Sequence, residues 1–198
     1  QEAGGFAAFE EIVGEGAERF GMRVCGYCIM STHWHLVLWP RGDGDLWAFM
    51  KWVTVTHSGR WHTAHGTAGI GHLYQGRFKS FPVQSNAYYL TLMRYVESNP
   101  LRAGIVDHSA AWPWSSLAVR LGQREGGVAL SDGPLTLPAR WAALVDRTPN
   151  MPQKDREMFE TCVARGRPMG DDEWALKTAG TLGLEAAFRP RGRPRNGV

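Results

Sequence analysis

The chain has 198 residues, of which 43% are hydrophobic and 21% are charged. This composition can bury one sizeable core and excludes an intrinsically disordered chain. Its three cysteines, an odd number, exclude a disulfide framework and suit a reducing cytoplasm. The net charge is +3, but residues 58–106 hold five basic side chains and one acid, whereas residues 1–30 hold five acids and two arginines. This asymmetry favours a polyanionic partner.

The first forty residues predict a helix followed by a β-hairpin. Apolar residues recur at helical spacing across residues 6–20, and Gly21 ends the pattern. Residues 22–30 are rich in Val, Ile, Tyr and Cys and predict a strand. A tight connection at Ser31 and Thr32 leads into a second strand, so the two strands are expected to pair antiparallel.

The second predicted strand carries a pair of histidines. Because alternate side chains of a strand point to the same side, His33 and His35 share one face, while Trp34 lies on the other. Neutral imidazole is a common metal ligand, and a strand anchored by a core holds its side chains in place. The pair therefore predicts a site for a divalent cation. Solvated histidines on a half-buried strand are the alternative.

A helix and a basic strand are predicted after the hairpin. Turn-forming residues precede a helix that begins at about Leu46, and a glycine-rich loop follows it at residues 63–71. The composition of residues 73–83 then predicts a strand, with Arg77 and Lys79 on one face. These cations suit contacts to phosphates; a solvated outer face is the alternative.

The next predicted helix begins at Ala87 and ends near Asn99, because Pro100 disfavours helical geometry in the residue before it. Tyr95 and Asn99 are four residues apart, which places them on one face of this helix at its carboxyl-terminal end. A phenol and an amide are thus predicted to lie side by side.

After residue 122 the composition shifts to glycine, proline and small residues, which indicates a different module. Residues 155–165 and 171–184 both have helical patterns. The end of the chain alternates arginine with proline or glycine and predicts no packed element. Its Arg-Gly-Arg-Pro segment, with Arg191 and Arg193, suits the minor groove of A·T-rich double-stranded DNA. A disordered basic tail is the alternative.

Three motifs in order carry a resemblance to a known family. They are His33-Trp34-His35, Gln75-Gly76-Arg77-Phe78-Lys79-Ser80 and Arg94-Tyr95-Val96-Glu97-Ser98-Asn99-Pro100-Leu101-Arg102-Ala103-Gly104. With these motifs the chain resembles the single-tyrosine HUH transposases, and more closely the REP-associated tyrosine transposases. The similarity extends from about residue 6 to residue 120, and residues 174–195 resemble the carboxyl-terminal region of that subgroup.

The resemblance implies an α+β fold with a ferredoxin-like antiparallel sheet, helices packed on it, the HUH motif on a central strand and a small helical carboxyl-terminal region. It divides the chain into a catalytic domain at residues 1–121, a helical region at residues 122–185 and a basic tail at residues 186–198. The family usually begins with a strand before the first helix. Because this chain starts at Gln1, within or just before that helix, we expect that strand to be missing. Thr32 stands where the family commonly has Asn.

The resemblance also implies the reaction and the residues that perform it. His33, His35 and Asn99 would bind Mg²⁺ or Mn²⁺. Tyr95 would attack a phosphodiester of single-stranded DNA, giving a 5′-phosphotyrosine link and a free 3′-hydroxyl. The implied substrate is a DNA hairpin of a repetitive extragenic palindrome. The candidates for gripping its backbone are Arg77, Lys79, Arg94 and Arg102. Structural ion pairs for some of them are the alternative.

Two other functions stay open on sequence grounds. One is a catalytically inactive DNA- or RNA-binding remnant of a transposase, which would bind without metal and would not cleave. The other is a structural zinc protein that uses Cys25 and Cys28 with the histidine pair. It ranks last, because too few residues separate the two pairs for the usual finger loop.

The sequence leaves both a monomer and a dimer open. A single tyrosine allows one covalent link per site at a time, so two cleavages need sequential turnover or a second subunit. The sequence has no signal-peptide pattern and no apolar run long enough to cross a membrane. We therefore expect a cytoplasmic bacterial protein that associates with the nucleoid and not with a membrane.

Overall fold

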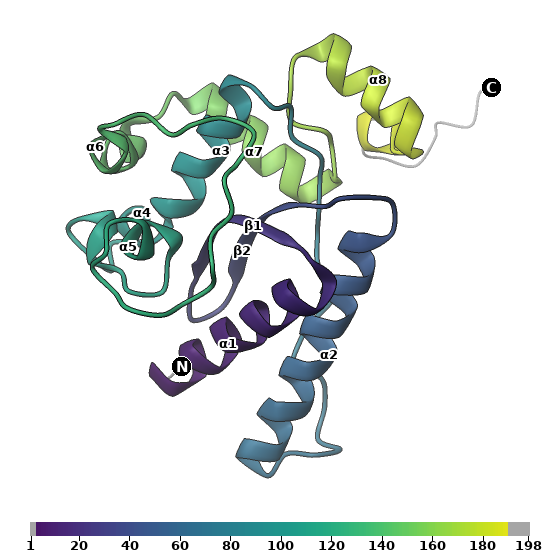
Figure 1. Ribbon diagram of the computed structural model, residues 1–198. Helices are drawn as coiled ribbons and strands as arrows, with labels where there is room; N and C mark the ends of the chain where they lie inside the picture. Colours follow the sequence, from purple (N-terminus) through teal and green to yellow (C-terminus); the bar gives the residue numbers. More distant parts are fainter. Residues whose placement is uncertain (1–2, 190–198) are drawn as a thin grey trace. The chain divides into compact units, whose positions relative to one another are not determined.

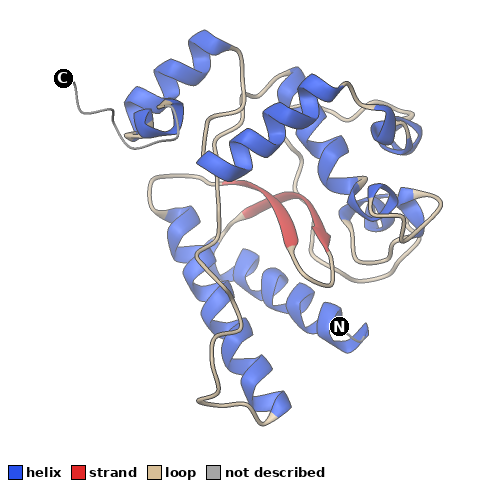
Figure 2. Ribbon diagram, turned by 180° about the vertical axis from the view of Figure 1, so that it is seen from behind, coloured by secondary structure: helices blue, strands red, loops and turns tan. Residues whose placement is uncertain are grey.

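The structure, a computed structural model, describes residues 3–189. It is an α+β fold with one antiparallel sheet and several helices (Figures 1 and 2). The predicted minor-groove residues Arg191 and Arg193 lie outside the described residues. Within the described range, every helix is too short or too polar to span a bilayer.

The elements follow one another along the chain as a helix, a hairpin and then helices only. In order they are α1 (Ala3–Phe20), β1 (Arg23–Ile29), β2 (Trp34–Trp39), α2 (Asp45–His65), α3 (Ala87–Glu97), α4 (Asn99–Arg102), η1 (Ser109–Ala111), α5 (Ser116–Arg120), α6 (Trp141–Asp146), η2 (Thr148–Asn150), α7 (Gln153–Arg165), α8 (Asp172–Leu182) and η3 (Glu185–Phe188).

The chain forms two compact units. The first comprises residues 1–78 and 90–150, and the second comprises residues 79–89 and 151–198. Residues 122–150 therefore group with the amino-terminal part of the chain. The predicted division into domains at residues 121 and 185 stays a prediction.

The β1–β2 hairpin organises the first unit. Its two strands pair antiparallel, with Tyr27 opposite Leu36 and Cys28 opposite His35. Helices α1 and α2 lie on one side of the hairpin and α3 lies on the other (Figures 1 and 2). On the α3 side the contact is close, because a Cβ on Gly26 would lie 2.6 Å from the Cε atom of Met93. A larger residue at this position would require the end of the Met93 side chain to move.

The core of the first unit lies between the hairpin and helices α1 and α2. Apolar side chains of α1 recur at helical spacing and point at the sheet, which is the pattern that predicted this helix. Burying them against two further elements stabilises all three. The core comprises Phe6, Phe9, Ile12, Val13, Met22, Val24, Tyr27, Ile29, Phe49, Met50, Val53 and Val128.

A buried carboxylate joins α1 to β1 and to the segment that follows α5. Glu10 is 4% exposed, and its Oε1 accepts hydrogen bonds from the Tyr27 hydroxyl and from Nη1 of Arg124, each at 2.6 Å. Burial and the bond to Glu10 raise the pKa of Tyr27, so this phenol stays protonated. The carboxylate is therefore compensated by two donors, as a buried charge requires.

Most of the predicted elements are confirmed. The helix at residues 6–20, the hairpin, the helix from about Leu46 and the helix that ends near Asn99 all form. Gly21 ends α1 in a left-handed conformation, with φ of 60°. Helices α7 and α8 confirm the two helical patterns near the carboxyl terminus.

The strand predicted at residues 73–83 is wrong. This segment is irregular, and its one ladder contact is an isolated parallel bridge between Val83 and Met169. Tyr74 bonds to His57 and Phe78 packs against the core, and both would lie on one face of a strand. The alternation is therefore present, but side-chain contacts hold the segment in place of a ladder of backbone hydrogen bonds.

The described sheet has two strands, so the ferredoxin-like sheet with a central histidine strand stays a prediction. The second edge of β1 is covered by irregular chain. The backbone N–H of Ile29 donates to the carbonyl of Trp114 at 2.9 Å, and that of Ser131 donates to the carbonyl of Val24 at 2.8 Å. Backbone groups at a sheet edge need such partners when they are buried.

The second unit joins residues 79–89 to helices α7 and α8. The backbone N–H of Met169 donates to Pro82 and that of Gln84 donates to Met169, at 2.8 and 2.9 Å. The Gln84 side chain also donates to Asp171 at 2.7 Å. Asp171 caps α8 by accepting from the backbone N–H of Trp174.

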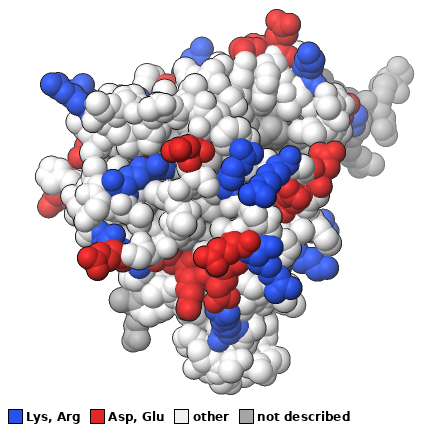
Figure 3. All heavy atoms as spheres, viewed as in Figure 1, with Lys and Arg blue, Asp and Glu red and all other residues white. Residues whose placement is uncertain are grey.

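The charge asymmetry of the sequence does not form one basic surface on the face shown in Figure 3. Basic and acidic side chains are interspersed there. Some exposed charges are paired: Arg60 of α2 donates to the Glu15 carboxylate of α1 through both of its terminal nitrogens, Nη1 and Nη2. Such exposed pairs contribute little stability.

Acid is expected to destabilise the protein partly through His57. Burial lowers the pKa of His57 to about 4 and raises that of Tyr74 to about 12, so a neutral imidazole and a protonated phenol share a hydrogen bond, with Nδ1 and the hydroxyl oxygen 2.6 Å apart. The unfolded chain binds this proton near pH 6.5, so the free energy of unfolding falls as the pH decreases from about 6.5 to about 4.

Urea unfolding of the wild type and of His57→Gln between pH 7.5 and 5 tests this prediction. Near pH 5 the free energy of unfolding should fall less steeply with decreasing pH in the variant, because unfolding takes up about one proton fewer. His33 and His35 are present in both proteins, so the difference between the slopes reports His57. Equal slopes would contradict the prediction.

Candidate active site

The two histidines lie on the side of the hairpin that faces α3. His35 is in β2, whereas His33 directly precedes the strand, where its carbonyl accepts from the backbone N–H of Met30 at 2.8 Å. Their ring centroids are 5.2 Å apart. The pair thus shares one face, although His33 lies just outside the regular strand in which it was predicted.

Trp34 holds the strand in this orientation. Its ring stacks on Phe9 of α1, with the centroids 5.5 Å apart, and it meets the edge of Tyr74 at 6.5 Å. A shift of one residue in the strand would exchange its two faces. The core contacts of Trp34 therefore keep His33 and His35 on the opposite side.

Tyr95 and Asn99 reach the histidines from the end of α3. Asn99 is the first residue of α4, and Pro100 follows it in the first turn, where its missing N–H costs nothing. The Nδ2 atom of Asn99 is 3.1 Å from Nε2 of His33. The ring centroid of Tyr95 is 6.3 Å from that of His35. The structure thus brings together the four side chains that the resemblance named.

Both imidazoles are held neutral. Burial and the charge of Arg102 lower the pKa of His33, while its hydrogen bond with Asn99 acts in the opposite direction. Burial, the neighbouring His33 and Arg102 lower the pKa of His35 to about 4. A neutral imidazole keeps a lone pair for a metal ion at neutral pH. The two imidazoles can therefore offer lone pairs to a cation, whereas Asn99 presents its Nδ2 atom to His33 in this arrangement.

Arg102 lies against Tyr95. Its Cζ atom is 3.6 Å from the centroid of the phenol ring, and its Nη2 donates to the backbone carbonyl of Tyr95 at 3.3 Å. The resemblance had made Arg102 a candidate for the DNA backbone, with a structural ion pair as the alternative, and a contact with Tyr95 was not predicted. The spacing of seven residues, two helical turns, was the signal that could have revealed this contact.

Glu97 fixes the end of α3. It is 0% exposed, and its Oε1 accepts from the Ser116 hydroxyl at 2.5 Å and from Nε of Arg120 at 3.2 Å. Its Oε2 accepts from Nε1 of Trp141 at 2.6 Å. The Ser116 oxygen also accepts from the backbone N–H of Tyr27 at 2.9 Å. This network connects α3 to β1, α5 and α6, and the sequence carried no local sign of it.

The other predicted DNA contacts are more dispersed. Nε of Arg94 donates to the carbonyl of Leu144 at 3.1 Å, which is a structural bond within the first unit. Arg77 is exposed in the irregular segment of the same unit. Lys79, also exposed, belongs to the second unit.

The structure contradicts the zinc protein. Cys25 and Cys28 are buried and unoxidised, and burial raises the pKa of the Cys28 thiol to about 12. Within residues 3–189 no group of three or more His, Cys, Asp or Glu side chains is placed to hold a metal ion. The candidate ligands His33, His35 and Asn99 are a different kind of group, because the third of them is an amide.

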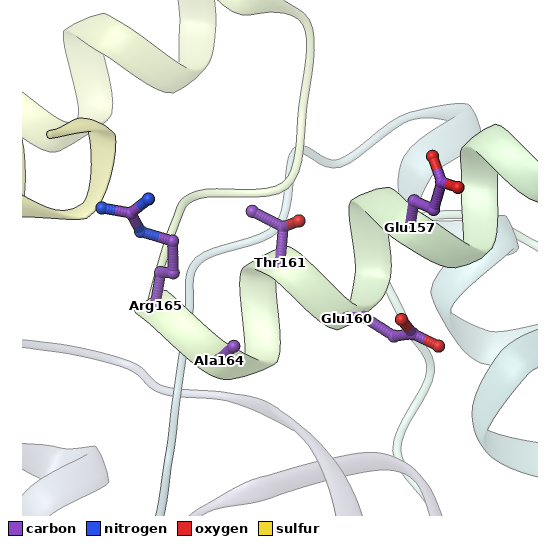
Figure 4. Close-up of a pocket in the computed structure, with 5 residues that line it drawn as sticks. All are labelled: Glu157, Glu160, Thr161, Ala164 and Arg165. Carbon is purple, nitrogen blue, oxygen red and sulfur yellow. The ribbon is translucent and has the colours of Figure 1, made fainter. Parts of the chain in front are cut away.

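A shallow hollow along α7 offers no competing site. Five side chains of that helix line it and point in different directions (Figure 4). No candidate residue of the sequence analysis is among them. They are Glu157, Glu160, Thr161, Ala164 and Arg165.

The amino-terminal part of the chain matches a known family. Residues 6–99 match the family model described as Transposase IS200 like. The chain is similar to IS200-like transposases. The matched range contains both histidines and Tyr95 and ends at Asn99, and it supports a transposase that binds and cleaves DNA. Comparisons with curated proteins and with solved structures give no significant match.

The protein is expected to lose stability when the Glu97 network is broken. Glu97→Gln removes the charge that Arg120 and Trp141 face, and hydrogen bonds to buried charges are among the stronger ones. We expect a loss of about 3 kcal/mol in the free energy of unfolding, measured in urea.

Glu15→Gln is the matched control. Its ion pair with Arg60 spans 2.7 Å between side chains that are 39% and 46% exposed. The expected loss is below about 1 kcal/mol. Similar losses in the two variants would show that the Glu97 network contributes no more than a surface pair.

Proposed function

We propose that the protein is a metal-dependent transposase and endonuclease of the HUH type, which cleaves and rejoins single-stranded DNA at hairpin sequences of the REP kind through a 5′-phosphotyrosine intermediate. The observation that carries the proposal is the meeting of Tyr95 and Asn99 with His33 and His35 in one unit. The match to IS200-like transposases over the same residues supports it.

The residues present fit a divalent cation. His33 and His35 are neutral, and rotation of the Asn99 amide would turn its oxygen toward the same place as its nitrogen. Imidazole and amide oxygen ligands suit Mn²⁺ and are compatible with Mg²⁺. When bound, the ion would polarise the scissile phosphate.

Tyr95 performs the covalent step in this proposal. Its hydroxyl oxygen bonds to the phosphorus while the bond from phosphorus to the 3′-oxygen breaks. The phenol proton is released, and the 3′-oxygen takes up a proton to become a hydroxyl. One phosphodiester replaces another, so the step needs no energy-rich cofactor and the free 3′-hydroxyl can reverse it.

The predicted DNA contacts, oligomeric states and location in the cell are compatible with the proposed substrate. Arg77 and Lys79 are exposed and can reach phosphates, whereas Arg94 and Arg102 already contact the protein. Sequential cleavage by a monomer and paired cleavage by a dimer are both compatible with one tyrosine per site. A DNA hairpin as substrate would place the protein at the bacterial nucleoid.

Covalent capture of DNA tests the proposal. Incubating the wild type with a hairpin-bearing oligonucleotide and Mn²⁺ should give an adduct that survives denaturing electrophoresis, and Tyr95→Phe should give none. Tyr88→Phe, on the same helix, is the matched control and should behave as the wild type. An adduct with Tyr95→Phe would disprove the assignment of the nucleophile.

Metal removal separates the proposal from the inactive remnant. Chelation of divalent cations should abolish the adduct, and His35→Ala should lower its yield at limiting Mn²⁺, because the remaining ligands hold the cation less tightly. Circular dichroism confirms that the variant is folded. DNA binding that persists in chelator, with no adduct under any condition, would favour the DNA- or RNA-binding remnant.

A further inference from the structure

Arg102 makes the closest cation–π contact described in the protein. Its Cζ atom is 3.6 Å from the Tyr95 centroid, and the next shortest such distance is 3.8 Å, from Arg23 to Trp39. A separation of 3.6 Å places the guanidinium directly against the phenol ring, where stacking and charge both act. The ring concerned belongs to the proposed nucleophile.

The guanidinium is held in this place by the turn between α3 and α4. Its Nε donates to the Ser98 hydroxyl and its Nη2 to the carbonyl of Tyr95, both at 3.3 Å. The backbone N–H of Arg102 donates to the carbonyl of Ser98 at 2.9 Å. Asn99 belongs to the same turn, so the position of the guanidinium is set by the element that brings the amide to His33.

The charge of Arg102 is not cancelled within the described protein. It takes part in none of the ion pairs among residues 3–189. Its field reaches both imidazoles, which it helps to keep neutral. An anionic phosphate brought next to Tyr95 would therefore meet a fixed positive charge.

We propose that Arg102 is a positioning residue for the nucleophile: it stacks on the Tyr95 ring and holds it at the site while presenting positive charge to the attacked phosphate. This inference rests on the proposed function and differs from a general grip on the DNA backbone. Removing a grip on the backbone would weaken DNA binding, whereas releasing the nucleophile from its position would slow the covalent step at saturating DNA.

Single-turnover adduct formation distinguishes these roles. Arg102→Lys keeps the charge but loses the planar stack and the paired hydrogen bonds. The rate at saturating hairpin oligonucleotide should fall about tenfold, with the half-saturating concentration unchanged within about twofold. Arg102→Gln should lower the rate further. Arg19→Gln, which removes a cation–π contact outside the site, should leave both values unchanged.

The inference would be overturned if Arg102→Lys formed the adduct as fast as the wild type at saturating oligonucleotide. It would also be overturned if only the half-saturating concentration changed. Thermal unfolding of each variant identifies any loss of folded protein. If the wild type itself forms no adduct, the proposed function fails. Fluorine NMR then tests by itself whether Arg102 stacks on Tyr95.

Fluorine NMR of protein labelled with 3-fluorotyrosine needs neither DNA nor metal. The chain has five tyrosines, and the resonance missing from Tyr95→Phe belongs to Tyr95. That resonance should move in Arg102→Lys and Arg102→Gln, while the other four stay in place. It should not move in Arg19→Gln. An unmoved Tyr95 resonance in both Arg102 variants would show that the stack is absent, and the inference would be wrong.

Discussion

The buried carboxylate of Glu97 is the group on which the candidate site depends. It lies between Tyr95 and Asn99 in sequence and points away from them into the protein, where it is 0% exposed. A charge in that environment is tolerated only when donors surround it. Because Ser116 bonds both to this carboxylate and to the backbone of β1, the end of α3 can lie in one place relative to the hairpin. That placement also sets the positions of the Tyr95 phenol and the Asn99 amide beside the histidines.

The hairpin is the other half of the arrangement. Its two faces have separate tasks: one packs on α1 and α2 through Trp34, and the other carries the histidines. The small sheet remains stable because irregular chain near Trp114 and Ser131 satisfies the second edge of β1. A rigid base of this kind is what a metal-ligand pair needs, since ligands that move lose affinity.

The candidate site combines neutral imidazoles with a fixed positive charge. Burial keeps His33 and His35 neutral, so their lone pairs can bind a cation, and the guanidinium of Arg102 adds a fixed positive charge beside them. The acid nearest in sequence to Tyr95, Glu97, is engaged in its own network. A site with this balance favours an anionic substrate, which agrees with the DNA transposition indicated by the family match.

Sequence periodicity alone determined the hairpin and the long helices, and it determined that His33 shares a face with His35 and Tyr95 with Asn99, because both patterns follow from local backbone geometry. It failed at residues 73–83, where Tyr74 and Phe78 contact His57 and the core but no neighbouring strand in the described residues supplies a ladder. Only the tertiary structure decided that the two faces meet. Their meeting depends on contacts such as that between Glu97 and Trp141, whose partners are far apart in the chain, and no local pattern records those.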